Sequence, residues 1–171
     1  MPTASKESLK TRKIICACVS IAIVIGIMLL LFVFSGQDAA ESSALSGRVT
    51  ALIIKVLRLD ETGLPLERAE HYVRKLAHFT IYSVLGVGLC GIAQCFLSRL
   101  RFLAASLAGI LISALDEFHQ LFVPGRGGTP QDVMLDYCGM VAGYFVCLGA
   151  ILIVLRISGK RNSRLSGADD S

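Results

Sequence analysis

Tryptophan is absent from this chain of 171 residues, and charged residues make up only 18% of it. Hydrophobic residues account for 54%, and the mean hydropathy is +0.66. Such a composition is far too apolar for an ordinary soluble domain, so it predicts a membrane protein. The chain also shows no internal repeat and no sign of a separate second domain.

Compact redox and metal motifs are missing as well. The six cysteines form no CxxC pair and lie in apolar segments, so we interpret them as small buried residues. No two histidines stand four residues apart beside a glutamate, as they do in one common type of zinc site. We therefore predict neither a metal ion nor another cofactor, although His78, His119 and several carboxylates are conceivable ligands.

Four apolar segments are candidates for membrane-spanning helices, each of which needs about 20 residues. Residues 14–34 contain no charged residue, and residues 76–97 are interrupted only by His78 near their start. Residues 102–115 and 137–157 form the third and fourth segments. The third has only 14 residues, equivalent to about 21 Å of helix, and is too short to cross the bilayer.

The sequence DEFHQLF follows the short third segment directly. Extending the helix through it to Phe122 gives 21 residues and a full crossing, with polar and apolar residues on opposite sides. The polar residues are Asp116, Glu117, His119 and Gln120. These residues would then lie within the outer third of the membrane. Ionisable groups there usually face the interior of the bundle or a wet cavity and often belong to a functional site. In the alternative interpretation, the helix ends at Leu115 and a solvated loop follows.

Four basic residues precede the first apolar segment, as they would in a signal peptide. That segment, however, is about twice as long as the apolar core of an ordinary signal peptide. We therefore predict an uncleaved membrane anchor. Cleavage after the small residues of SGQDAA is the alternative.

Basic residues are unevenly distributed between the two sides of the predicted bundle. Ten of the 17 Lys and Arg residues, with three acids, lie in the N-terminal tail, the 98–101 turn and the C-terminal end. The connections on the other side hold seven basic and ten acidic residues. By the positive-inside rule we expect a multi-pass cell-membrane protein with both termini in the cytoplasm and residues 35–75 and 123–131 outside. The excess of basic residues behind the net charge of +4 is thus explained by membrane orientation, and we predict no nucleic-acid partner.

These patterns predict an all-α, integral membrane four-helix bundle formed by residues 14–157. Residues 1–13 are expected to be a cytoplasmic tail, and residues 158–171 a disordered cytoplasmic tail. Aliphatic residues recur at helical spacing in residues 42–58, which predicts an extracytoplasmic amphipathic helix between the first two spans, lying on the outer leaflet. The second span is expected to begin as a helix at Leu66.

Polar stripes also mark the second and fourth spans. The stripe on the second span consists of His71, Arg74, Lys75, His78 and Tyr82. Anchoring of Lys and Arg at the membrane surface is the alternative explanation. One face of the fourth span carries Asp132 and Asp136 together with Gly139 and Gly143, and the glycines permit close helix packing. We therefore expect this face to point into the bundle.

The segment VPGRGGTPQD predicts a tight reversal between the third and fourth spans, with Arg126 at its tip. A planar guanidinium suits a phosphate or a carboxylate, although an ordinary exposed loop arginine is the alternative. We expect the three polar stripes and this arginine to form one site near the outer surface. His78, Asp116 and Asp132 should then lie close together.

Several of these motifs together resemble the VanZ-like family of bacterial membrane proteins, which is named for a teicoplanin-resistance determinant. The motifs are RKLAHFTIY, SALDEFHQLFVPGR, the following Asp132 and GMVAG. FSGQDAAESSALS is also similar to that family, and the resemblance covers roughly residues 30–150. It implies a role in the cell envelope and in teicoplanin susceptibility, without a mechanism. Asp136 stands where the family more often has Asn, so a role there that needs a neutral amide is in doubt.

Acidic and basic groups nearly balance in the predicted site, which suits paired and partly buried charges. We predict that it binds the anionic headgroup of a membrane lipid or cell-wall precursor. An intramembrane hydrolase or transferase acting on a phosphorylated lipid and a proton or ion pathway are the alternatives. The predicted ligand-binding residues are Arg74, Lys75, His78, Tyr82, Asp116, Glu117, Gln120, Arg126, Asp132 and Asp136. The candidates for catalysis are His78, Asp116, Glu117, His119 and Asp132.

Overall fold

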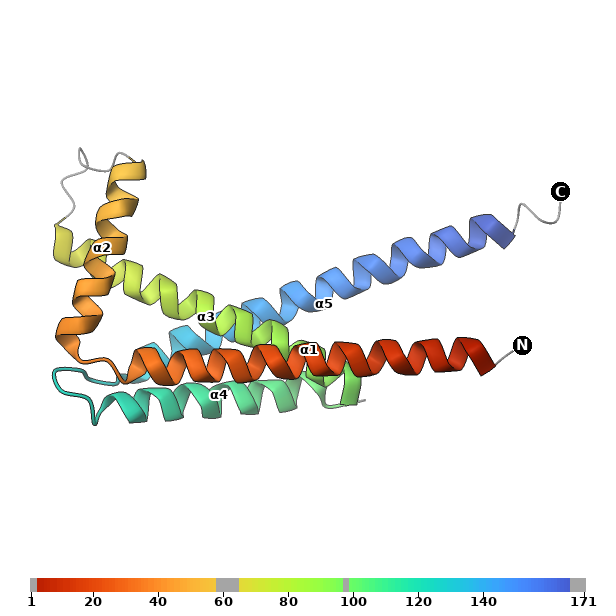
Figure 1. The fold of residues 1–171 in the computed structure, drawn as a ribbon, viewed down its shortest axis with the longest axis horizontal. Coiled ribbons are helices and arrows are strands. Elements are labelled where there is room, and N and C mark those ends of the chain that lie inside the picture. The colour runs from red at the N-terminus through yellow and green to blue at the C-terminus, as the bar shows by residue number, and fades with distance from the viewer. Residues whose placement is uncertain (1–2, 58–64, 97–98, 167–171) are drawn as a thin grey trace.

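Helices make up almost all of the described chain. The computed structural model describes residues 3–57, 65–96 and 99–166, and within these ranges it contains no β-strand. The helices are α1 (Thr3–Ser35), α2 (Ala39–Leu57), α3 (Leu66–Phe96), α4 (Arg101–Gln120) and α5 (Pro130–Ser166) (Figure 1). All except α2 are long and apolar enough to cross a membrane. The prediction of an all-α protein with four spans, the second beginning at Leu66, is confirmed.

The third span carries its polar residues on the helix itself. Helix α4 continues through Asp116 and ends at Gln120, so the alternative in which it ends at Leu115 is wrong. The predicted end at Phe122 is two residues too late. The reason is that the backbone N–H groups after Gln120 donate to carbonyls three residues back, which departs from the α-helical pattern.

Helices α3 and α5 make the most extensive helix contact and hold the core between them. Gly139 and Gly143 of α5 face the backbone of α3, where a Cβ on either glycine would overlap Phe79 or Ser83. This close approach confirms that the glycine face of α5 points into the bundle. The largest buried side chains around it are Tyr82, Leu85, Met140 and Tyr144.

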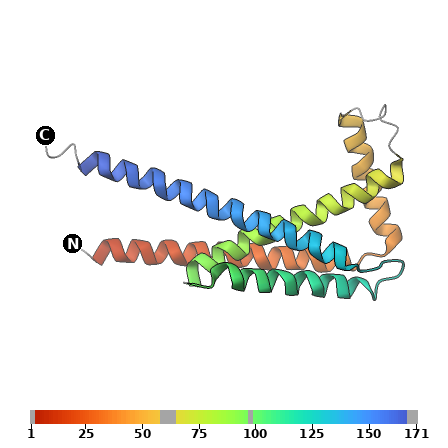
Figure 2. The same ribbon diagram turned by 180° about the vertical axis from the view of Figure 1, so that it is seen from behind.

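Helix α1 runs beside α4 and packs against α3, which crosses it obliquely in both views (Figures 1 and 2). Large apolar side chains cover its outer face, and Phe32 is 69% exposed. Leu111 on α4 and Leu155 on α5 are exposed in the same way. Lipid tails are as apolar as leucine, so a bilayer suits these surfaces where water would not. The outer surface therefore agrees with the four spans.

Helix α2 leaves the bundle at a steep angle between α1 and α3 (Figure 1). Asp38 caps it by accepting a hydrogen bond from the backbone N–H of Glu41 at 2.8 Å. The small and polar side of α2 packs on α3, with Thr50 buried, and its aliphatic side stays exposed. The exposed aliphatic residues are Leu45, Val49, Leu52 and Val56. The predicted amphipathic helix is present, although it begins at Ala39 instead of residue 42, and residue 58 lies outside the described residues.

The first residues of α1 and the last residues of α5 lie at the same end of the bundle, away from α2 (Figure 1). Helix α5 continues to Ser166. The prediction of a disordered tail from residue 158 is therefore wrong for residues 158–166. Once the apolar span has nucleated a helix, each further polar residue adds to it at little cost. Residues 167–171 lie outside the described residues.

Candidate functional site

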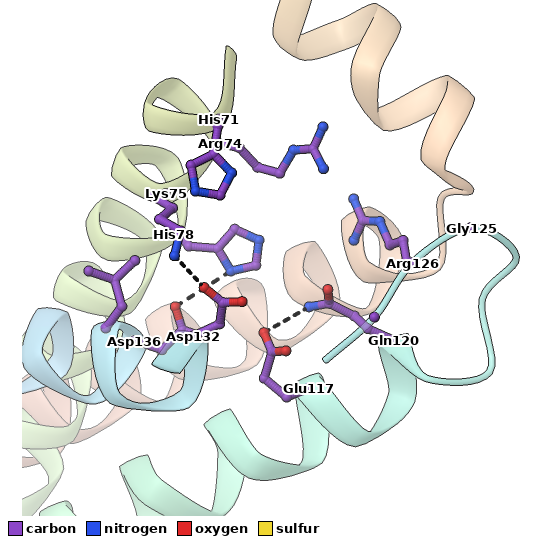
Figure 3. A pocket seen from close by; sticks show the side chains of 12 residues that line it. His71, Arg74, Lys75, His78, Glu117, Gln120, Gly125, Arg126, Asp132 and Asp136 are labelled. Atoms are coloured by element: carbon purple, nitrogen blue, oxygen red, sulfur yellow. Dashed lines mark hydrogen bonds and ion pairs between the residues drawn. The ribbon is translucent and has the colours of Figure 1, made fainter. Parts of the chain in front are cut away.

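A polar cavity of about 200 Å³ lies at the end of the bundle that carries α2 (Figure 3). The first turns of α3 and α5, the last turn of α4 and the loop after α4 surround it. Its polar lining residues are His71, Arg74, Lys75, His78, Glu117, Gln120, Arg126, Asp132 and Asp136. The structure therefore brings the three polar stripes and the loop arginine to one place.

The start of α5 positions two acids of this cavity. Thr129 accepts a hydrogen bond from the backbone N–H of Asp132 at 3.3 Å and donates to its carboxylate at 2.8 Å, and Pro130 takes the first helical position. The backbone N–H of Thr129 also donates to Glu117 at 3.1 Å, which ties α5 to α4. Asp132 and Asp136 follow one turn apart on the same side of α5.

Two contacts between basic and acidic groups join α3 to α5. Lys75 pairs with Asp132 at 2.9 Å, and 35% and 29% of their side chains are exposed. His78 lies one turn further along α3, with its Nδ1 3.5 Å from the carboxylate of Asp136. The side chain of Asp136 is only 1% exposed, so the second contact is the buried one.

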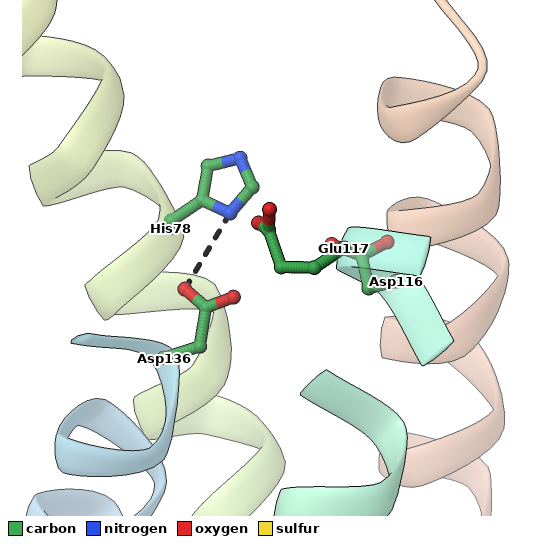
Figure 4. Close-up of side chains that lie close together, drawn as sticks. All are labelled: His78, Asp116, Glu117 and Asp136. Atoms are coloured by element: carbon green, nitrogen blue, oxygen red, sulfur yellow. Dashed lines mark ion pairs between the residues drawn. The ribbon is translucent and has the colours of Figure 1, made fainter. Parts of the chain in front are cut away.

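A His–carboxylate cluster, made of His78, Asp116, Glu117 and Asp136, joins α3, α4 and α5 (Figure 4). One nitrogen or oxygen atom from each of the four side chains lies within 4.8 Å of the others. The three acidic residues are 8%, 5% and 0% exposed, respectively. Among the residues that the structure describes, none of the three carboxylates forms an ion pair with Lys or Arg. The cluster therefore concentrates acidic groups in a buried place.

Neutral donors hold the three carboxylates in position. The hydroxyl of Ser35 at the end of α1 donates to Asp116 at 2.5 Å. The side-chain amide of Gln120 lies 3.2 and 3.3 Å from the two α4 carboxylates of the cluster. The hydroxyl of Ser113 lies 3.4 Å from Asp136 and shares its hydrogen between that carboxylate and the carbonyl oxygen of Val133 at 3.2 Å. These bonds orient the acids without neutralising them.

Two arginines, Arg74 of α3 and Arg126 of the loop, lie on the α2 side of the cavity, and we call them the arginine pair (Figure 3). Arg74 donates to Ser43 at 3.2 Å and Arg126 to Ser42 at 2.5 Å, both on α2. The Nε of each is buried without an acceptor, and within the described ranges neither forms an ion pair. Burial lowers the pKa of Arg126, and repulsion by Arg74 lowers it further. Two cationic groups therefore face each other without a direct ion-pair partner, although Asp116 and Glu117 lie near enough to attract Arg126.

An apolar groove of about 180 Å³ adjoins the arginine pair. It shares Arg74, His78 and Arg126 with the polar cavity. Its aliphatic and aromatic lining residues come from α1, α2 and α3, and they are Phe34, Leu45, Val49, Val73, Ala77 and Ile81. The groove therefore connects the charged residues with apolar surface between these helices.

Asp116 belongs to the His–carboxylate cluster but does not line the polar cavity. Two further predicted site residues, Tyr82 and His119, also lie outside the cavity wall. Tyr82 belongs to the hydrophobic core and is 0% exposed. His119 lies against α1, with its ring centroid 5.5 Å from that of Phe32. Both residues share a helical stripe with residues of the cavity. A stripe specifies a direction around the helix axis, but it specifies neither the depth along the axis nor the neighbouring helix.

Three serines were not singled out by the sequence reasoning. Ser35 holds Asp116, and Ser42 and Ser43 hold the arginine pair. All three lie in FSGQDAAESSALS, which resembles the VanZ-like family but carried no predicted role. A run of small hydroxyl residues directly after an apolar span is the signal that would have pointed to them.

A family model described as VanZ/LLP1 matches residues 20–155, which is most of the chain. The chain belongs to the VanZ/LLP1 family. The matched range includes all lining residues of the polar cavity. VanZ/LLP1 membership and the four apolar helices fit a multi-pass membrane protein of the cell envelope that is linked to glycopeptide resistance. No curated protein and no solved structure matches the chain.

Proposed function

We propose that this protein binds the anionic headgroup of a membrane lipid or lipid-linked cell-wall precursor at the outer side of the membrane. This binding would alter susceptibility to teicoplanin-type glycopeptides. The arginine pair carries the proposal, because Arg74 and Arg126 face one gap without a carboxylate partner. Both residues are partly buried, and like charges that are partly removed from water favour an anion between them.

A phosphate group matches the arginine pair in charge and in hydrogen-bonding geometry. Each guanidinium offers parallel N–H donors that contact two oxygens of a phosphate or carboxylate at once. The serines of α2 accept one bond from each arginine, and the buried Nε groups have no acceptor. The two side chains are thus held in place, and each still has N–H donors that could bind a ligand.

The apolar groove supports an amphiphilic ligand over a water-soluble anion. It begins at the arginine pair and is lined by aliphatic side chains of α2 and α3. A hydrocarbon chain attached to a bound headgroup would lie along these side chains, because apolar surface leaves water at a gain of about 25 cal/mol per Å². A lipid or a polyprenyl-linked precursor has both parts.

Native mass spectrometry tests the proposal on protein purified gently in a non-ionic detergent. We expect wild-type protein to retain an anionic lipid or wall precursor. Arg126→Lys should retain about tenfold less, because an ammonium group cannot reproduce two parallel N–H donors. In cells with equal membrane abundance of the two proteins, the same substitution should weaken the effect on teicoplanin susceptibility.

Arg48→Lys is the matched control, because Arg48 lies on an exposed position of α2 and does not line the cavity. This variant should retain the same amount of lipid as the wild type. Equal retention by Arg126→Lys and wild-type protein would refute a headgroup site at the arginine pair.

A second candidate function is hydrolysis or group transfer on a phosphorylated lipid, and the His–carboxylate cluster favours it. An imidazole and three buried carboxylates beside an anion site are suited to general acid and base chemistry. Incubation of the co-purified species with wild-type protein separates the two functions. Release of phosphate supports a hydrolase, and transfer of the phosphorylated group to an added acceptor alcohol supports a transferase. Recovery of the intact species in both assays supports the binding protein.

A further inference from the structure

The geometry points to a binding site for a divalent cation formed by His78, Asp116, Glu117 and Asp136. The site goes beyond the proposed headgroup binding, since it uses a different set of side chains. Three helices contribute: His78 comes from α3, two acids from α4 and one from α5 (Figure 4). The ligands are far apart in the sequence, which explains why no compact metal motif is visible there.

The spacing of the four groups suits one ion. Their candidate ligand atoms all lie within 4.8 Å of one another. Nitrogen and oxygen ligands lie about 2.0–2.2 Å from a zinc ion, so in its usual tetrahedral geometry they are about 3.3–3.6 Å from one another. Small rotations of the side chains would close the remaining difference.

Charge balance is the first argument for a cation. The three carboxylates lie near the ends of two candidate membrane spans and are almost fully buried. Carboxylates in such a place bind a cation or a proton, because isolated charges are costly there. Among the described residues, no Lys or Arg forms an ion pair with these carboxylates. Lys75 pairs with Asp132, and the arginine pair bonds to serines of α2.

An independent argument comes from Asp136. Its side chain is 1% exposed, and its Oδ1 receives no hydrogen bond from any described residue. That oxygen faces His78 at 3.5 Å, which is too long for a good hydrogen bond. In Figure 4 the carboxylate of Asp136 and the ring of His78 lie on one side of a space, and Glu117 reaches toward it from the other. A cation in this space would supply the missing partner.

The surroundings have the features of a metal site's outer shell, in which ligating carboxylates accept further hydrogen bonds. Ser35, Ser113 and Gln120 are all neutral and all donate to carboxylates of the cluster. One imidazole with three carboxylates is a donor set for Zn²⁺ or Mn²⁺. A cation here would face the same cavity as the arginine pair, so it would stand beside a bound phosphate.

The first test measures metal in wild-type protein whose purification tag has been removed. After exposure to Zn²⁺ or Mn²⁺ and removal of the excess, elemental analysis should find about one ion per chain. Saturating metal should raise the unfolding temperature by about 5 °C, and EDTA should reverse the rise. Bound Mn²⁺ should show electron spin echo modulation from an imidazole nitrogen. Absence of stoichiometric metal, or bound Mn²⁺ without this modulation, would overturn the site.

Two variants locate the metal. Asp136→Asn and Glu117→Gln each remove one ligand charge and should lower the bound metal at least tenfold. Glu67→Gln changes an exposed carboxylate in the first turn of α3 and should leave the metal content unchanged. Unchanged metal in folded Asp136→Asn and Glu117→Gln would place the ion elsewhere and overturn the proposal. If neither variant folds, the wild-type protein still tests the site. Modulation from an imidazole nitrogen in its Mn²⁺ signal supports the site, and absence of this modulation overturns it.

Failure of this proposal and failure of headgroup binding are distinguishable. Arg126→Lys should lose the co-purified lipid and keep the metal, because Arg126 is not one of the four ligands. Loss of lipid with full metal therefore supports both sites. A metal-free wild type that still retains an anionic lipid leaves the arginine pair intact and overturns the cation site alone.

Discussion

Ser35 and Lys75 each contact an acid in or beside the polar cavity, but the two contacts differ in energy. The ion pair between Lys75 and Asp132 is partly exposed, and such pairs contribute about 0–1 kcal/mol. The hydrogen bond from Ser35 to Asp116 is buried and joins α1 to α4. Loss of a partner from a buried acceptor costs about 1–3 kcal/mol. The stability of the cavity therefore depends more on the hydroxyl than on the visible ion pair.

We predict that Ser35→Ala destabilises the protein by about 1–3 kcal/mol, because one oxygen of Asp116 loses its donor. Thermal unfolding followed by circular dichroism measures the change, since the chain has no tryptophan to report it. Ser158→Ala is the control at an exposed position of α5 and should have little effect. If both variants unfold at the wild-type temperature, the bond to Asp116 is not a stabilising contact.

Individual site residues were predictable only in part from the sequence. Polarity against an apolar background marked Asp116 and Glu117, and both are buried beside the cavity or within its wall. The same signal marked His119, which lies against α1 instead. Ser35 carried no such signal, because its bond to Asp116 crosses 81 positions of the chain. Contacts of that range depend on how helices pack, which a helical wheel does not describe.

Helix pairs were more predictable where small residues repeat. Gly139 and Gly143 on one face of α5 indicated close packing, and that face meets the backbone of α3. The partner helix was not predictable, because several spans had the length and hydropathy to fill the role. Helix α2 was predicted from its aliphatic spacing. Its contacts with the arginine pair through Ser42 and Ser43 were not.

At the scale of the helix pair, Gly143→Ala should destabilise the bundle. A Cβ at this position would overlap the backbone of Ser83, so α3 and α5 would have to separate. Overpacking of this kind typically costs about 1–3 kcal/mol. Heating followed by size-exclusion chromatography should show the loss of folded protein at a lower temperature than for the wild type.

Gly149→Ala is the matched control on the same helix, because a Cβ there meets no atom within 4 Å. Alanine favours a helix over glycine by up to about 1 kcal/mol, so this variant should be as stable as the wild type or slightly more stable. If Gly143→Ala is as stable as Gly149→Ala, then α3 and α5 can separate without loss of stability, and the prediction is wrong.

At the scale of the whole molecule, the shortest candidate span limits where a bilayer can lie. Helix α4 has 20 residues and is about 30 Å long, which equals the thickness of the hydrocarbon layer. Helices α1 and α5 have 33 and 37 residues and are longer than this layer is thick. They extend past α4 at the end of the bundle where α1 begins and α5 ends (Figure 1). That end carries most of the basic residues, and the polar cavity lies at the opposite boundary. Headgroups are found at this boundary, so the arginine pair stands at a suitable depth.

The positive-inside rule predicts that both termini face the cytoplasm and the polar cavity faces outward. Cysteine labelling in intact cells tests this orientation. In a protein whose six native cysteines are replaced, Gly127→Cys places a thiol in the loop after α4, and Gly159→Cys places one near the end of α5. A Cβ at either glycine meets no atom within 4 Å, so each cysteine should fit and react in a folded protein. An impermeant maleimide should label Gly127→Cys in intact cells and Gly159→Cys only after lysis. The reverse pattern would turn the cavity toward the cytoplasm, and an outer-leaflet lipid or wall precursor on the outside could then no longer be its ligand.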